Sequence, residues 1–165
     1  MSGEVPDLTA ADARLDRIAL EGETMMRLSP LIEADRAQAV ADLQAENRFR
    51  PAAGGDGPYG LRLSIHEGRL VFDIRAVDDT KLRTILLALG PFRGLIRDYQ
   101  MLVDSHIKAV EEGREARIQA IDMGRRGLHN EGADLLVQRL AGKVAIDFAT
   151  ARRLFTLVCV LHQRI

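Results

Sequence analysis

The spacing of hydrophobic residues changes at Gly90-Pro91, and this change constrains the fold more than any other feature of the chain. Before it, short segments such as residues 61–65 alternate apolar and polar side chains, as half-buried strands do. After it, apolar residues recur three and four positions apart, as they do on one face of a helix. Such residues are Phe92, Leu95, Ile96, Tyr99, Leu102, Val103, Ile107 and Val110. The pattern predicts an α+β protein.

Four segments before Gly90 have the composition of strands. They are residues 15–20, 61–65, 70–74 and 82–89. Gly68 lies in the short turn between the second and third segments and permits positive φ there, so these two segments predict a hairpin. Thr84-Ile85 favours a strand over a helix start in the fourth segment. We expect a small antiparallel sheet in the N-terminal half, packed against a helical C-terminal half.

Helix ends are marked by capping residues. Ser29 is a suitable N-cap and Pro30 suits the first helical position, because proline needs no hydrogen-bond acceptor there. Asp147 is a suitable cap for the last helix, and an acidic side chain at a helix start also favours the helix dipole. The predicted helices cover residues 30–47, 91–112, 115–140 and 148–162, with a brief extended link at 144–146.

Length and charge limit the kinds of protein that this chain can be. Its 165 residues suit one domain with a sizeable core. We expect a mobile polar tail over residues 1–13 and a single domain over residues 14–165. The formal net charge of -1 argues against a general polyanion binder, and the 4% aromatic content argues against nucleic-acid binding by base stacking.

The single cysteine and the absence of long apolar runs bear on location. Cys159 lies in the apolar run 157–161, where a thiol is usually buried and inert, and one cysteine cannot form an internal disulfide. The N-terminus lacks the pattern of a secretory signal. No apolar run approaches the roughly 20 residues of a membrane span. We expect a cytoplasmic protein that does not enter a membrane.

Residues 121–132 (Ile-Asp-Met-Gly-Arg-Arg-Gly-Leu-His-Asn-Glu-Gly) are the best candidate for a site, because they combine many ionisable residues with three glycines. On a helix, one side would carry Asp122, Arg125, Arg126, His129 and Asn130. A glycine inside a helix costs up to about 1 kcal/mol relative to alanine. The three glycines therefore predict either close helix packing or a break in the helix.

Three interpretations of this polar side stay open. Asp122 can pair internally with Arg125 or Arg126 at helical spacing. Alternatively, the side chains bind a phosphate or carboxylate through Arg125, Arg126, His129 and Asn130, joined by Arg152 and Arg153 from the last helix. In the third interpretation, His129 acts as a catalytic acid or base with Asp122 or Glu131 as its carboxylate partner.

The function expected from these residues is binding of a small anionic ligand or a protein partner in the region of Arg125, Arg126 and His129. One alternative is a hydrolase or transferase acting on a phosphorylated small molecule, so whether the chain is an enzyme stays open. Another is a structural protein that self-associates, for example as a homodimer. The histidines lack metal-ligand spacing, so we expect no metal and no cofactor.

Two long segments, residues 121–132 and 147–162, resemble a bacterial uncharacterised protein family, number 0262 of the UPF series. Pro58-Tyr59, Pro91-Phe92-Arg93 and Asp98-Tyr99 are similar to the same family, and the resemblance extends from Arg14 to the end of the chain. It implies a small, single-domain, intracellular protein without an established activity. It supplies no catalytic residues.

Overall fold

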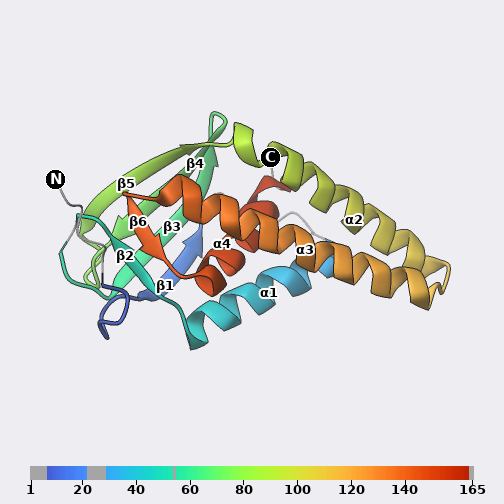
Figure 1. The fold of residues 1–165 in the computed structure, drawn as a ribbon, viewed down its shortest axis with the longest axis horizontal. Coiled ribbons are helices and arrows are strands. Elements are labelled where there is room, and N and C mark those ends of the chain that lie inside the picture. The colour runs from blue at the N-terminus through green and yellow to red at the C-terminus, as the bar shows by residue number, and fades with distance from the viewer. Residues whose placement is uncertain (1–6, 22–28, 54, 164–165) are drawn as a thin grey trace.

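The computed structural model describes residues 7–21, 29–53 and 55–163, and within them strands come mainly first and helices mainly last. The elements in chain order are β1 (Leu15–Leu20), α1 (Pro30–Ala45), β2 (Phe49–Pro51), β3 (Tyr59–His66), β4 (Arg69–Arg75), β5 (Lys81–Ala88), the 3-10 turn η1 (Gly90–Phe92), α2 (Arg93–Glu111), α3 (Glu115–Leu140), β6 (Val144–Ile146) and α4 (Phe148–His162). In Figure 1 the strands lie at the left and the α2–α3 hairpin extends to the right. The predicted α+β class is confirmed.

The main sheet has the strand order β1-β3-β4-β5. Strands β3, β4 and β5 form the predicted antiparallel meander, with Leu61 opposite Ile74 and Leu63 opposite Phe72. The expectation of a wholly antiparallel sheet is wrong, because β1 pairs parallel to β3. Helix α1 lies between these two strands in the chain, and a connection containing a helix is long enough to return a strand in the parallel direction.

A second, two-stranded sheet joins β2 and β6. Residues 144–146, expected as an extended link, pair antiparallel with residues 49–51. Helix α1 ends at Ala45 rather than at Asn47, and the Asn47 side chain bonds both to the helix end and to β1. Its Nδ2 donates to the carbonyls of Leu15 and Leu43, and its Oδ1 accepts from the Leu15 amide. Asn47 therefore ties the end of α1 to the start of β1.

Helix α3 is continuous through the glycine-rich segment, so close packing replaces the alternative of a break. At Gly132 an added Cβ would lie 2.1 Å from a ring carbon of Phe155. Only glycine lets α3 approach α4 this closely. An added Cβ at Gly127 would meet nothing within 4 Å, so close helix packing requires a glycine at position 132 but not at position 127.

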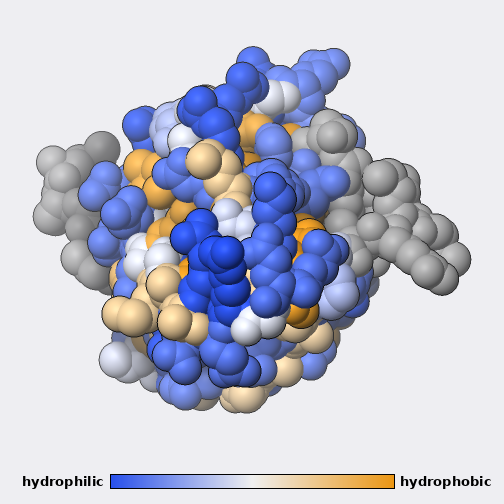
Figure 2. All heavy atoms as spheres, turned by 90° about the vertical axis from the view of Figure 1, so that its right-hand side faces the viewer, coloured by the Kyte–Doolittle hydropathy of each residue, from blue (hydrophilic) through white to orange (hydrophobic). Residues whose placement is uncertain are grey.

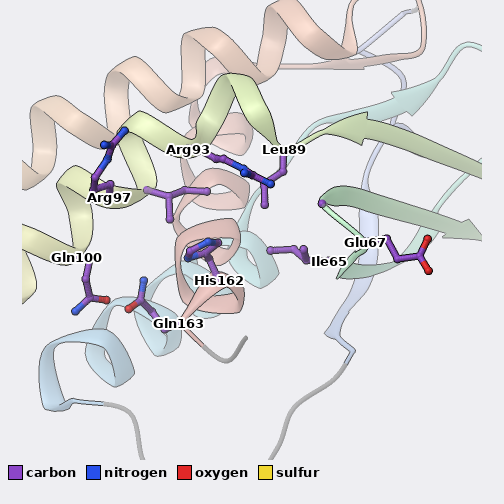
Figure 3. A pocket seen from close by; sticks show the side chains of 10 residues that line it. Ile65, Glu67, Leu89, Arg93, Arg97, Gln100, His162 and Gln163 are labelled. Carbon is purple, nitrogen blue, oxygen red and sulfur yellow. The ribbon is translucent and has the colours of Figure 1, made fainter.

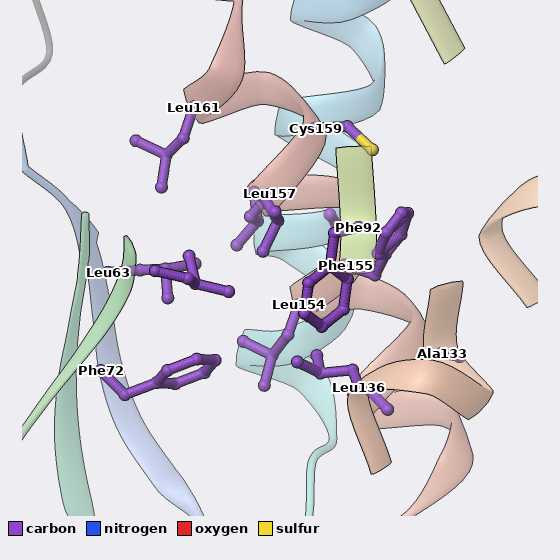
Figure 4. Close-up of a cluster of buried hydrophobic side chains, with 14 of the residues drawn as sticks. Leu63, Phe72, Phe92, Ala133, Leu136, Leu154, Phe155, Leu157, Cys159 and Leu161 are labelled. Carbon is purple, nitrogen blue, oxygen red and sulfur yellow. The ribbon is translucent and has the colours of Figure 1, made fainter. Parts of the chain in front are cut away.

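Helix α4 is the centre of the hydrophobic core. It packs against α1, α2, α3 and β3, and its residues Leu154, Phe155 and Leu157 are fully buried. Figure 4 shows these side chains between Leu63 and Phe72 of the sheet and residues of α3. Cys159 is buried in the same helix, and burial raises the pKa of its thiol well above the ordinary value. The predicted inert role of Cys159 fits this environment.

The chain preceding β1 touches the rest of the fold. Ala13 is buried, and its carbonyl accepts a hydrogen bond of 2.9 Å from the amide of Phe49. The mobile tail expected over residues 1–13 stays a prediction, and residues 1–6 lie outside the described residues. Among the described helices, none is long and apolar enough to cross a membrane.

Candidate functional site

A small cleft of about 140 Å³ lies where α1, α3 and α4 meet. It collects five of the residues proposed from the sequence as ligand-binding: Arg125, Arg126, His129, Arg152 and Arg153. The two arginine pairs lie about 27 residues apart in the chain, and the packing of α3 against α4 places them on one cleft. Helix α1 supplies the opposite wall with Asp35, Gln38, Ala39 and Asp42.

The Asp35 carboxylate is the centre of a buried polar network. Its Oδ2 accepts a hydrogen bond of 2.7 Å from the hydroxyl of Tyr99, and its Oδ1 is paired with the guanidinium of Arg125. Asp35 is only 9% exposed, so its charge requires these partners. Burial by itself would lower the pKa of Arg125, but the charges and hydrogen bonds of Asp35 and Asp122 together outweigh burial and raise the pKa. Arg125 therefore stays protonated, and its charge is balanced by the carboxylates with which it pairs.

His129 is buried beside this network. Its side chain is 4% exposed, and its ring lies 5.6 Å from the ring of Tyr99 and 6.4 Å from that of Phe155, centre to centre. Its Nε2 has no hydrogen-bond partner within the described ranges. The pKa of His129 is lowered to about 4, mainly by burial; the charge of Asp35 opposes this shift, and those of Arg152 and Arg125 add to it. The imidazole is consequently neutral at pH 7.

The remaining arginines of the cleft differ in their partners. Arg153 Nε lies 3.3 Å from Asp42 Oδ2, and Gln38 donates to the other oxygen of that carboxylate at 2.9 Å. Arg152 Nε donates to the uncharged Asn130 side chain at 2.9 Å. Arg126 is exposed at the cleft mouth. Within residues 7–21, 29–53 and 55–163, neither Arg126 nor Arg152 forms an ion pair with a carboxylate.

The surroundings of Arg152 in the cleft carry an excess of positive charge. Partial burial lowers the pKa of Arg152, and the charges of Arg153, Arg126 and Arg125 lower it further in that order. Four arginines and two aspartates line the cleft. Its carboxylates therefore do not neutralise the cleft, and an added anion would be attracted to it.

The three residues proposed for catalysis do not form one unit. Asp122 accepts a hydrogen bond of 3.1 Å from Arg125, as the internal-pairing interpretation expected. Glu131 is exposed and lines a groove between α2 and α3, on another side of the helix from the cleft. In the part of the chain that the structure describes, no hydrogen bond or ion pair joins His129 to either carboxylate.

Sequence reasoning did not identify Asp35, Asp42 or Tyr99 as parts of this region. Asp35 and Asp42 are seven residues apart on the predicted first helix, so they share one face of it. That spacing was a usable signal, but it does not say which helix the face meets. No cluster of three or more potential metal ligands occurs in the described ranges.

The α2–α3 groove bears on the self-association alternative. It is lined by Leu95, Met101, Leu102, Gly124 and Gly127 among other residues, and Met101 is 61% exposed. Figure 2 shows the end of the molecule to which this hairpin extends, where hydrophilic residues surround small separate hydrophobic areas. Met123 of α3 is 72% exposed as well, and self-association stays a prediction.

The chain is similar in sequence to the members of one protein family. The family described as Uncharacterised protein family (UPF0262) matches residues 12–164. A UPF0262 protein of Granulibacter bethesdensis is 68% identical over 96% of this chain and 94% of its own. Those of Acidiphilium cryptum and Rhodospirillum rubrum are 62% and 49% identical, covering 92% and 98% of this chain and 93% and 99% of theirs. No solved structure matches the chain.

Proposed function

The chain belongs to the Uncharacterised protein family UPF0262, whose description names no activity, and from its geometry we propose that it binds a small anion in the cleft between α1, α3 and α4. The observation that carries the proposal is the pair Arg126 and Arg152. Both guanidinium groups line the cleft, and neither is paired with a carboxylate among the described residues. Planar guanidinium groups suit the oxygens of phosphate and carboxylate.

The other cleft residues have supporting roles in this proposal. Asp35 and Asp122 neutralise Arg125, and Asp42 pairs with Arg153. These pairs hold the three helices in place, so that Arg126 and Arg152 are the groups that gain most from an anion. His129 lines the same cleft, but its imidazole is neutral at pH 7 and adds no positive charge to attract an anion.

The size of the cleft limits the ligand. Pockets that enclose whole drug-sized molecules have volumes of about 300–1,000 Å³. The cleft has about 140 Å³, which suits one phosphate or carboxylate group and leaves no room for a nucleotide base. A larger ligand would insert only its anionic group and extend beyond Arg126 into solvent.

Calorimetric titration of the full chain with inorganic phosphate and with succinate tests the proposal. We expect saturable binding to the wild-type protein and about a tenfold or greater loss of affinity in Arg126→Gln, because one charge-assisted contact contributes about 1.5–3 kcal/mol. Arg126 is exposed, so its replacement should leave the melting temperature without ligand unchanged.

Arg139→Gln is the matched control, since Arg139 is an exposed arginine on the same helix and does not line the cleft. It should retain wild-type affinity. Arg152→Gln should lower the affinity as much as Arg126→Gln. Equal binding by Arg126→Gln, Arg139→Gln and the wild type would overturn the proposal. Absence of any binding by the wild type would favour a protein partner.

A further inference from the structure

A second and larger cavity of about 890 Å³ lies at the other side of α2, between the start of that helix, the β3–β4 turn and the end of α4. Figure 3 shows the side chains that line it. None of them lines the α1–α3–α4 cleft. None was singled out from the sequence as a site residue, because they come from three distant segments of the chain.

One part of the cavity wall is apolar. Ile65 of β3 lines the cavity and is partly exposed, whereas Leu89 and Ile96 lie behind it and are almost completely buried, at 3% and 1% exposure. In Figure 3, Ile65 points into the same space as Leu89. Such a surface favours contact with the hydrocarbon part of a ligand, since removing apolar area from water is favourable.

Basic side chains lie above this apolar floor. Arg93 and His162 both point into the space, whereas Glu67 points out of it (Figure 3). Partial burial lowers the pKa of His162, and the positive charge of Arg93 lowers it further. Arg93 forms no ion pair among the residues that the structure describes. Its charge is therefore available to a ligand.

The β3–β4 turn lies close to this arginine. Gly68 adopts φ of +73°, and a Cβ added there would lie 3.4 Å from a guanidinium nitrogen of Arg93. The Arg93 head group therefore rests against the turn. Gln100 and Gln163 line the same cavity on the α2 and α4 sides and offer amide hydrogen bonds. The cavity thus joins an apolar floor, the two arginines Arg93 and Arg97, and neutral hydrogen-bond donors.

We propose that this cavity binds an amphipathic carboxylic acid, with its carboxylate on Arg93 and its hydrocarbon chain on the apolar floor at Ile65. The site is separate from the anion cleft of the proposed function and does not depend on it. The His162 side chain, which lies near Arg93, can supply a further hydrogen bond to the carboxylate. A volume of about 890 Å³ falls in the range of pockets that enclose a small organic molecule.

Titration of the full chain with butanoate, hexanoate and octanoate tests the proposal. Affinity should rise by up to about fourfold for each added methylene that the floor buries, which is the fold-change for about 0.8 kcal/mol. Octanol, which lacks the charge, should bind about tenfold more weakly than octanoate. Nuclear Overhauser contacts should join the octanoate chain to the methyl groups of Ile65.

Arg93→Gln should lower octanoate affinity about tenfold or more and leave octanol affinity unchanged. Arg117→Gln is the matched control, because Arg117 is an exposed arginine on α3 that does not line the cavity. Arg126→Gln should not affect octanoate, so failure of one site can be told from failure of the other. Equal affinities for octanoate and octylammonium, or unchanged octanoate affinity in Arg93→Gln, would overturn the proposal.

Discussion

The hydroxyl of Tyr99 donates a hydrogen bond of 2.7 Å to Oδ2 of Asp35 and so joins α2 to α1 across 64 residues of sequence. The other oxygen of Asp35 is paired with Arg125, so that three helices meet at one carboxylate. Burial raises the pKa of Tyr99, and the charge of Asp35 raises it further. The phenol therefore keeps its proton and stays a donor throughout the ordinary pH range.

Replacing Asp35 by asparagine should destabilise the protein strongly. The change leaves Arg125 partly buried without its main counter-charge, and breaking one partner of a buried pair costs about 3–5 kcal/mol. The free energy of unfolding from urea titration measures this effect. Asp122→Asn removes the more exposed partner of the same arginine and should cost less than about 1 kcal/mol. Equal costs in the two variants would refute the central role of Asp35.

Two glycines of α3 should respond to alanine with opposite signs. Gly132→Ala forces a Cβ within 2.1 Å of Phe155, and overpacking of this kind costs about 1–3 kcal/mol or more. Gly127→Ala meets nothing within 4 Å and should stabilise the helix by up to about 1 kcal/mol. Thermal unfolding of both variants gives the comparison. A stabilised Gly132→Ala would show that α3 and α4 do not pack as described.

His129 should make folding sensitive to mild acid. Its pKa is about 4 when folded and 6.5 for the unperturbed side chain, so between these values the unfolded chain binds a proton that the folded chain does not. This contribution is complete above pH 6.5 and is lost as the pH falls toward 4. The loss amounts to about 2 kcal/mol by pH 5. The free energy of unfolding should therefore fall more steeply between pH 7 and 5 in the wild type than in His129→Gln. Parallel curves would contradict the buried, neutral state of His129.

Removing the negative charge of Asp42 should strengthen anion binding in the cleft. Asp42→Asn leaves Arg153 without its carboxylate partner and adds one unit to the positive excess around Arg152. We expect phosphate affinity to rise by about threefold to tenfold, equivalent to about 0.7–1.4 kcal/mol. Asp134→Asn, an exposed change elsewhere on α3, should have no effect. Weaker binding by Asp42→Asn would instead make Asp42 part of the ligand site.

Local features of the sequence predicted most of the secondary structure. The helix starts at Pro30 and Phe148 were predicted from Ser29 and Asp147, and the side chains of both caps accept the expected amide hydrogen bonds. The β3–β4 hairpin was predicted from strand alternation and from Gly68, which has positive φ. These features depend on residues close together in the chain, so a single sequence is enough to predict them.

Contacts between distant residues could not be predicted in this way. The parallel pairing of β1 with β3, and the pairing of β2 with β6, depend on where α1 and α4 pack. The two glycines Gly127 and Gly132 have the same local preference, and only the position of Phe155 distinguishes them. Periodicity identifies which side of an element is apolar, but it does not identify its partner.

By itself, the sequence determined the helices and the strands of the main sheet, where most of them begin and end, and that arginines and a histidine share one side of α3. Only the tertiary structure decided which of these charges are neutralised. Asp35 pairs with Arg125 across 90 residues, whereas the adjacent Arg126 lies at the cleft mouth. The physical reason is that the interaction energy of a charged group depends on its burial and on the nearest opposite charge in space. Neither follows from local sequence.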